Sequence, residues 1–359
     1  MNASENSGAL SADCAQAAID HSRNPALGSA ARRRLLLAGG AVAVAPALVS
    51  TARAQTRELK VLSAFAPNLS YSREIIKVYV DGLQKASGGA ITSRISGPEV
   101  VSFADQFQPA AAGAFDLLFT HGAYHSGTSG IGLSIDAIAA DIPKRRSSGV
   151  FDFMDRHYNQ LGLKLLAITS TGKKGYQFVS KQPIKGSPGL AGMKVRGTVS
   201  YHPMIKALGG SPVVMGGGEI YSALEKGVID AAAWGLTGVA DLKWNEVAKY
   251  VVQPTFGSSS FLVFMNLKAW NALSPDERKL FNDEATKLEV ASGKRFEDLA
   301  AEERIELSKR GMQEATFAPA DAGRLEELWA QGVWEVARAK SAAATDELRA
   351  LAQKAGLSA

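Results

Sequence analysis

Hydrophobic positions along the chain alternate between two periods. "ELKVLSAF" (58–65) is a short apolar run typical of a strand, and apolar residues then recur at helical spacing from 75 to 83 before Gly88 and Gly89. Further strand-like runs follow, separated by helical patterns: "ITSRIS", "FDLLFT" (115–120), "YQFVS", "MKVRG" and "IDAAAW". This alternation is typical of parallel strands with helices on both faces. The pattern therefore predicts an α/β fold.

One helix is predicted to be much longer than the others. In "SPDE", Ser274 is a suitable N-cap, Pro275 suits the first helical position, and Glu277 completes a capping box. No proline follows until after Arg310, and Gly311 is a suitable stop. A helix of about 36 residues would be roughly 54 Å long. It is longer than one lobe, so we expect it to lie across two lobes as an outer spine.

If residues 1–54 are removed as an export segment, 359 − 54 = 305 residues remain, a length that suggests two lobes around separate cores. No internal repeat or low-complexity linker separates them, so we expect strands to cross between the lobes. The expected division is 55–176 with 259–310 for lobe 1, and 177–258 with 311–359 for lobe 2. Hinges are expected near 175–178 and 254–260, because small residues there can absorb a change of backbone angles.

Residues 1–54 are interpreted as an export segment. The stretch 32–54 combines an arginine cluster, an apolar run from Leu35 to Val49 and the small-x-small site at 52–54. The apolar run is too short and too interrupted to span a bilayer of roughly 30 Å. Arg32 and Arg33 followed by "RLL" fit the twin-arginine pattern. We therefore expect a periplasmic protein that begins at Gln55 after cleavage.

Composition narrows the classes of function. The only cysteine, Cys14, precedes the expected cleavage site, so the mature chain has no disulfide and no thiolate chemistry. The net charge of +5 is modest and partly lies in the export segment, and no basic block with interleaved aromatic residues indicates nucleic acid binding. A diffuse positive charge suits an anionic ligand.

A central run carries a resemblance to a known family. Residues 185–234 hold three elements in order: "GMKVRG", "LGGSPVVM" and "EIYSALEKGVID". Their order and spacing resemble the DctP-like solute-binding proteins of tripartite ATP-independent periplasmic (TRAP) transporters, and a looser likeness covers nearly all of the mature chain. The resemblance implies a two-lobed periplasmic binding protein fold (type II-like) spanned by a long helix. It also implies an organic acid as ligand and TRAP membrane permease subunits as partners.

Arg196, in the "MKVRG" strand, is the leading candidate for binding. The resemblance implies that this arginine holds the carboxylate of the ligand. Its guanidinium is permanently charged and offers a fork of donors that matches a carboxylate. The alternative is that Arg196 pairs with Asp230 or Glu219 inside lobe 2.

Seven further residues complete the candidate substrate-binding set: Gln177, Trp234, Tyr124, His121, Glu219, Phe65 and Tyr71. By the family pattern Trp234 faces the cleft, although a tryptophan after small residues also suits a core. Gln177 stands where relatives carry a second basic residue, so we expect one charged clamp. His121, Tyr124, Phe65 and Tyr71 follow strands, where α/β sheets place ligand-facing loops, and surface polarity explains them equally well.

Other chemistries find little support in the sequence. His121 and His125 suit a metal only on a helix and lack a third ligand, so no metal is expected. "GGG" (216–218) lacks the Lys-Ser/Thr of a phosphate loop, and no nucleophile elbow or paired carboxylates occur. We therefore expect no enzyme and no cofactor, but a binding protein for a 2-oxo, 2-hydroxy or aromatic monocarboxylate. The alternatives are a C4-dicarboxylate-binding protein, or a secreted α/β enzyme or sensory receptor.

Overall fold

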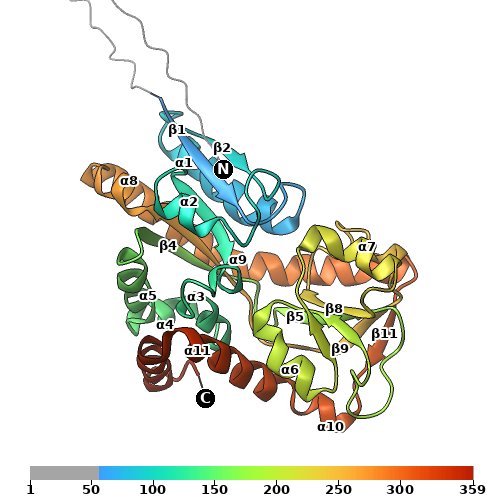
Figure 1. Ribbon diagram of the computed structural model, residues 1–359. Coiled ribbons are helices and arrows are strands. Elements are labelled where there is room, and N and C mark those ends of the chain that lie inside the picture. The colour runs from blue at the N-terminus through green and yellow to red at the C-terminus, as the bar shows by residue number, and fades with distance from the viewer. Residues whose placement is uncertain (1–55, 359) are drawn as a thin grey trace, which may run out of the picture. The chain divides into compact units, whose positions relative to one another are not determined.

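The computed structural model describes residues 56–358 of the chain. The expected export segment, with Arg32, Arg33 and the cleavage site at Ala54, lies outside the described residues. Residues 56–358 form two sheets, each with helices packed on it, and a long helix extends past both sheets (Figure 1). The two-lobed α/β fold predicted from the sequence is confirmed.

The first lobe is built on a five-stranded sheet with the order β2-β1-β3-β10-β4. Its strands are β1 (Arg57–Ser63), β2 (Ile91–Ser96), β3 (Leu117–His121), β4 (Leu163–Ser170) and β10 (Ser260–Asn266). Its helical elements are η1 (Ser72–Ile76), α1 (Lys77–Ala86), α2 (Phe107–Ala111), η2 (Gly122–His125), α3 (Ile131–Ser134), η3 (Ile135–Ala137), α4 (Ile142–Ser147), α5 (Val150–Asn159) and α8 (Leu267–Asn271).

The second lobe is built on a six-stranded sheet with the order β11-β9-β5-β8-β6-β7. Its strands are β5 (Tyr176–Ser180), β6 (Lys194–Arg196), β7 (Ser211–Val213), β8 (Ala231–Gly235), β9 (Tyr250–Phe256) and β11 (Gln313–Thr316). Its helical elements are η4 (Val199–Tyr201), α6 (His202–Ala207), η5 (Gly217–Glu219), α7 (Ile220–Glu225), η6 (Trp244–Glu246) and α10 (Pro319–Ala322).

One strand in each sheet runs against its neighbours, which the expectation of parallel strands did not include. β10 is antiparallel to β3 and β4, and β5 is antiparallel to β8 and β9. Both strands are the first to be reached after the chain passes from the other lobe. The reversal follows from this path, because a strand that enters from the neighbouring lobe runs in the opposite direction to strands joined by crossover helices.

Two short connections join the lobes side by side. Residues 171–175 link β4 to β5, and residues 257–259 link β9 to β10. They are hydrogen-bonded to each other, from Thr171 N to Ser259 O (3.0 Å) and from Gly175 N to Gly257 O (2.9 Å). A Cβ atom on Gly175 would lie 2.4 Å from Ser259 N, so only glycine permits this close approach.

The long helix α9 (Pro275–Lys309) begins and ends where the sequence predicts. Ser274 Oγ accepts from Glu277 N (3.2 Å), and Glu277 Oε2 accepts from Ser274 N (2.8 Å), which forms the expected capping box. Phe281 is buried near its start and Leu307 near its end, within one hydrophobic core that includes residues of both sheets. Figure 1 shows α9 passing from beside β4 to beside β8. The helix therefore spans both lobes.

The C-terminal helix α11 (Leu325–Lys354) differs from the expected division of the chain. Trp329 and Val333, in its first half, pack into the second-lobe core, but Leu348 and Ala352 pack with the first-lobe core. Residues 311–359 were expected to belong to lobe 2 as a block, because nothing in their sequence pattern distinguishes the two surfaces that α11 contacts. Across residues 56–358, no helix combines the length and apolar character needed to cross a bilayer.

Candidate ligand-binding site

Arg196 is the last residue of β6 and is held rigidly by backbone groups. Its neighbours in register are Ala232 of β8 and Val213 of β7. The Nε and Nη2 groups donate to Met215 O (3.2 and 3.1 Å), and Nη1 donates to Ala233 O (3.1 Å). These bonds use three of its five N–H groups. The guanidinium is thereby fixed in direction, and its two remaining N–H groups are shared between the Tyr124 hydroxyl and any further acceptor.

Among residues 56–358, the charge of Arg196 has no carboxylate partner. The residue is only 1% exposed, and burial lowers the pKa of its guanidinium. It forms no salt bridge with any Asp or Glu that the structure describes. Asp230 instead accepts from Lys194 N (2.8 Å), and Glu219 accepts from Gly216 N (3.1 Å). The alternative in which either of these carboxylates pairs with Arg196 is therefore not what the structure shows.

A buried cation without a counter-ion has a physical consequence. Moving a charge out of water costs several kcal/mol unless an opposite charge or hydrogen bonds compensate. Aromatic side chains lie beside it. Arg196 Cζ is 5.1 Å from the centroid of the Trp234 ring, and burial raises the pKa of Tyr124 although the charge of Arg196 opposes that shift. The arrangement is suited to an anion that arrives from outside the chain.

Aromatic side chains from both lobes enclose this arginine. The cavity beside it is lined by Phe65, Tyr71, His121, Tyr124, Tyr176, Arg196, Thr198, Tyr201, Trp234, Gly235, Ser259 and Phe261. The rings touch one another, as in Tyr71 against Phe261 with centroids 4.7 Å apart. The cavity measures about 30 Å³, room for a water molecule or two but not for an organic acid. A ligand therefore enters only when the lobes or the rings move apart.

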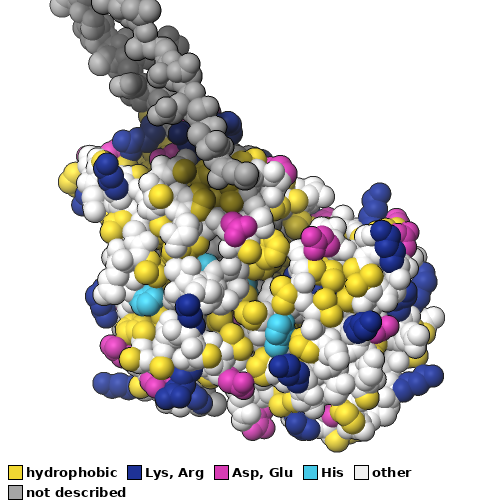
Figure 2. Space-filling view, viewed as in Figure 1, with side chains coloured by type: hydrophobic (Ala, Val, Ile, Leu, Met, Phe, Trp, Pro, Cys, Tyr) yellow, Lys and Arg dark blue, Asp and Glu magenta, His cyan; other side chains and the backbone are white. Residues whose placement is uncertain are grey.

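Direct contacts hold the two lobes together around the cavity. Tyr71 donates from its hydroxyl to Thr237 O (3.0 Å), and Ser70 N donates to Asp241 Oδ2 (3.1 Å). A Cβ atom on Gly216 would lie 3.1 Å from the ring of Phe103, which belongs to the first lobe. Figure 2 shows hydrophobic side chains gathering along the middle of one face, with most Lys and Arg at its edges.

Six of the eight candidate residues line this one cavity: Arg196, Trp234, Tyr124, His121, Phe65 and Tyr71. Gln177 and Glu219 do not. Successive residues of a strand point to opposite faces, so Tyr176 faces the cavity while Gln177 lines a separate hollow with Gln253 and Arg304. Its Nε2 donates to Gly235 O (3.1 Å). The neutral side chain of Gln177 therefore gives no information on whether the cavity holds one positive charge or two.

Sequence reasoning missed Asp136, which lies behind the cavity, and six residues that line it: Tyr176, Thr198, Tyr201, Gly235, Ser259 and Phe261. Tyr176 could have been found from the two-residue period of its strand, since it and Gln177 cannot share a face. Tyr201 lies in η4, directly after the Arg196 strand. Asp136 gave no signal, because an aspartate in the stretch "SIDAIAAD" fits no motif for binding or catalysis. In the structure its carboxylate is buried against His121 and Tyr176.

His121 and His125, which are four residues apart in the sequence, contact different partners. His121 Nε2 lies 2.9 Å from Asp136 Oδ2, whereas His125 Nε2 lies 2.6 Å from Tyr158 Oη. Burial lowers the pKa of His125 to about 3, with smaller effects from His121 and His157. Among residues 56–358, no three His, Cys, Asp or Glu side chains are grouped as metal ligands.

Two lobes joined by short crossing segments, with a charged, ring-lined cavity between them, define the class of bilobal solute-binding proteins. The family model of the bacterial extracellular solute-binding proteins, family 7 (DctP), matches residues 140–339. The chain belongs to this family, whose members are solute-binding receptors.

Individual relatives agree with this assignment. Outer membrane transporter protein TsaT of Comamonas testosteroni is 24% identical over 299 residues, covering 79% of this chain and 85% of that protein. A TRAP periplasmic solute-binding protein of Desulfovibrio salexigens, solved with orotic acid, has a TM-score of 0.74 at 20% identity and covers 84% of this chain and 98% of its own. DctP7 of Bordetella pertussis, a receptor that binds pyroglutamic acid, has a TM-score of 0.73 at 16% identity and covers 83% and 100%.

Proposed function

We propose that this chain is the extracytoplasmic receptor of a TRAP transporter and that it captures an organic acid through one carboxylate bound at Arg196. The observation that carries the proposal is a fully buried guanidinium with spare donors and no carboxylate partner among the described residues. A charge-assisted hydrogen bond of this kind contributes on the order of 1.5–3 kcal/mol. The rings around it suit the small or flat body of a 2-oxo, 2-hydroxy or aromatic monocarboxylate.

The ligands of two structural neighbours are consistent with this class, whereas a third neighbour, from Rhodoferax ferrireducens, was solved with the dicarboxylate malonate. The Desulfovibrio salexigens protein was solved with orotic acid, and the Bordetella pertussis receptor binds pyroglutamic acid. Both ligands are ring-shaped acids with one carboxyl group. Sequence identities of 20% and 16% support a shared fold and not a shared ligand. The ligand class proposed for this chain is therefore argued from its own cavity.

Capture requires the lobes to separate and close again. We assign the hinge to residues 171–175 and 257–259, with lobe 1 built on the first sheet and lobe 2 on the second. Gly257, at φ +60°, adopts a backbone conformation that favours glycine, and it lies where the chain crosses. The closed receptor then delivers the acid to the membrane permease subunits. Small-angle scattering should show a smaller radius of gyration on addition of ligand, and an unchanged profile at saturation would contradict the hinge.

The decisive experiment is calorimetric titration of the parent and of Arg196→Ala with organic acids. We expect at least about a tenfold loss of affinity in the variant, the equivalent of roughly 1.4 kcal/mol. Arg94→Ala is the matched control, because Arg94 is an exposed arginine of β2 on the outside of the first lobe. Binding by Arg196→Ala within twofold of the parent would place the carboxylate elsewhere.

We also propose export through the twin-arginine route, with cleavage after Ala54. Replacing Arg32 and Arg33 by lysine should retain precursor in the cytoplasm, because that route reads the arginine pair. Sequencing of the mature N-terminus should begin at Gln55. A mature protein that begins before Arg32 would sink this route.

A further inference from the structure

One phenol of the aromatic cavity has no hydrogen-bond partner in the part of the chain that the structure describes. Tyr201 is the last residue of η4, lines the cavity together with Arg196 and is 4% exposed. No hydrogen bond joins its hydroxyl to another residue between 56 and 358. A buried polar group that lacks a partner costs free energy, so the Tyr201 hydroxyl is suited to a partner from outside the chain.

Other polar groups of the cavity are already engaged. Tyr71 Oη and Trp234 Nε1 both donate to Thr237 O, at 3.0 and 3.1 Å. The Tyr124 hydroxyl is hydrogen-bonded to Arg196, and it therefore belongs to the carboxylate end of the cavity. None of these groups is as free as the hydroxyl of Tyr201.

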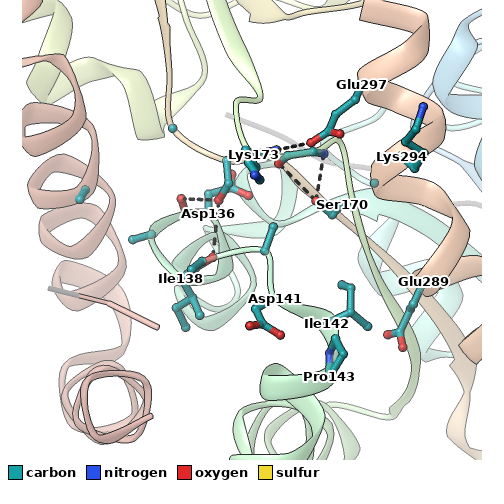
Figure 3. Close-up of a pocket in the computed structure, with 18 of the residues that line it drawn as sticks. Asp136, Ile138, Asp141, Ile142, Pro143, Ser170, Lys173, Glu289, Lys294 and Glu297 are labelled. Atoms are coloured by element: carbon teal, nitrogen blue, oxygen red, sulfur yellow. Dashed lines mark hydrogen bonds between the residues drawn. The ribbon is translucent and has the colours of Figure 1, made fainter. Parts of the chain in front are cut away.

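Tyr176 is engaged as well, and on the side away from the cavity. Its hydroxyl donates to Asp136 Oδ2 (2.8 Å), lies 2.9 Å from His121 Nε2 and is hydrogen-bonded to Ser259. Asp136 forms part of the wall of a second cavity along α9, as Figure 3 shows. The Tyr176 hydroxyl is thus directed toward that wall, and Tyr201 remains as the free phenol.

The position of Tyr201 relative to Arg196 is fixed by a tightly folded segment, residues 196–201. Tyr201 N donates to Thr198 O (2.9 Å), and Thr198 Oγ1 lies 3.0 Å from Ser200 Oγ. A Cβ atom on Gly197 would lie 2.8 Å from Tyr201 Cβ, so the glycine permits this close approach. Because the whole segment belongs to the second lobe, movement of the lobes leaves the separation of the two side chains unchanged.

The ring of Tyr201 is held by the second-lobe core. Its centroid lies 4.9 Å from the Trp329 ring and 5.2 Å from the Tyr176 ring. Burial raises the pKa of Tyr201 well above its usual value, although the charge of Arg196 opposes that shift. The phenol therefore stays protonated at neutral pH and offers a fixed hydrogen-bond donor.

We propose that Tyr201 determines specificity for acids with an oxygen on the carbon next to the carboxylate: Arg196 binds the carboxylate, and the Tyr201 hydroxyl donates to the 2-oxo or 2-hydroxy oxygen. Both side chains line one cavity with room for a water molecule or two, so the ligand atoms that they contact are a few bonds apart. The proposal rests on the proposed function, since it presumes that a carboxylate occupies Arg196.

The physical basis is the cost of leaving a buried donor without an acceptor. An acid with an oxygen on C2 replaces water at the Tyr201 hydroxyl and keeps its hydrogen bond. An acid without that oxygen places an apolar CH₂ group there and leaves the hydroxyl unpaired in the closed cavity. A site built to bond one polar atom discriminates strongly against analogues that lack it.

The test titrates the parent by calorimetry with matched acids on two carbon skeletons. The first set is propanoate, pyruvate and lactate, and the second is phenylacetate, phenylglyoxylate and mandelate. On at least one skeleton, the 2-oxo or 2-hydroxy acid should bind about tenfold more tightly than the unsubstituted acid. On that skeleton the isomer with a displaced hydroxyl, 3-hydroxypropanoate or 4-hydroxyphenylacetate, should bind more weakly than lactate or mandelate.

Tyr201→Phe removes the hydroxyl and keeps the ring. The affinity for the 2-oxo or 2-hydroxy acid should fall by about tenfold, while the affinity for the unsubstituted acid should change little. This ratio between two ligands does not depend on the fraction of folded protein, because loss of folded protein affects both titrations alike. Thermal melts establish the folded fraction.

Two further tyrosines supply matched controls. The Tyr71 hydroxyl joins the two lobes, so Tyr71→Phe should weaken all of these acids by a similar factor. The Tyr221 hydroxyl donates to Glu246 outside the cavity (2.8 Å), so Tyr221→Phe should change neither the affinities nor their ratio. Only Tyr201→Phe is expected to change the ratio.

The outcomes separate the two proposals. If Tyr201→Phe weakens every acid by the same factor, or leaves the ratio unchanged, the specificity role is overturned while Arg196-dependent binding stands. A parent that binds the unsubstituted acid or the displaced isomer most tightly on both skeletons overturns it as well. If none of these acids binds in an Arg196-dependent way, the proposed function fails, and the role of Tyr201 fails with it.

Discussion

Two buried arginines, Arg145 and Arg196, have the same chemistry but opposite surroundings. Both are 1% exposed. Arg145, on α4 of the first lobe, donates to Ala139 O, Ile138 O and Ser260 Oγ. Burial lowers its pKa to about 10, and the carboxylates of Asp136, Glu289 and Asp141 act against that shift, so it stays charged at neutral pH.

Arg196 differs in what faces it. Its bonds go to two carbonyls, its neighbours are rings, and its pKa is lowered by burial without a salt bridge in the described structure. Arg145 thus uses four of its five N–H groups within the protein, and carboxylates act on its charge, whereas Arg196 uses three on carbonyls and forms no salt bridge in the described structure. Burial alone does not distinguish a structural arginine from a binding one, whereas the balance of donors, acceptors and nearby charge does.

The largest expected effect comes from exchanging each arginine for methionine. Arg145→Met should lower the free energy of unfolding by about 3–5 kcal/mol, because buried carboxylates lose their cation and several oxygens lose their donor. Arg196→Met should change it by less than about 1 kcal/mol, since the cost of burying an unpaired charge disappears with the charge. Urea denaturation measures both. Equal losses of the free energy of unfolding in the two variants would contradict the distinction between a structural arginine and a binding arginine.

A smaller effect is expected for Arg196→Lys. Lysine keeps a positive charge but presents it as a point, without the planar fork that matches a carboxylate. Affinity should fall by about tenfold and remain above that of Arg196→Ala. Calorimetry with the best-bound acid gives the ranking. A lysine variant as tight as the parent would show that charge alone recruits the ligand.

The smallest effect concerns the ring beside the arginine. Trp234→Leu removes a cation–π contact at 5.1 Å and one wall of the cavity, so we expect roughly three- to tenfold weaker binding, equivalent to about 0.7–1.4 kcal/mol. Trp270→Leu is the control, because Trp270 packs in the first lobe on α8 and does not line the cavity. Loss of stability without loss of affinity in Trp234→Leu would identify Trp234 as a core residue.

The elements that the sequence predicted well are those with local causes. The start of α9 depends on Ser274, Pro275 and Glu277, which all act within one turn, and its length follows from the absence of proline. The crossing of the chain between lobes is not local. The antiparallel direction of β5 and β10, and the packing of α11 on both lobes, depend on contacts between distant segments that no short pattern encodes.

The same distinction applies to the site. That Arg196 lines the cavity was expected from the motif around it, because a charge in an apolar strand by itself left pairing with Asp230 or Glu219 equally open. Gln177 was misplaced by ignoring the side-chain alternation that put Tyr176 in the cavity instead. Asp136 was not predictable, since its importance arises only when β3 and β5 bring His121 and Tyr176 to the same carboxylate oxygen.

The small volume of the aromatic cavity has a consequence for the speed of capture. A cavity of about 30 Å³ cannot admit an organic acid. The lobes, which contact each other in this structure, must therefore separate before a ligand can bind. The open form is then a pre-existing conformer, and its population scales the apparent association rate. In stopped-flow mixing, the observed rate should level off with rising ligand concentration at the frequency of opening. At high solute concentration, the rate of capture would then be limited by the opening of the receptor and not by diffusion of the solute.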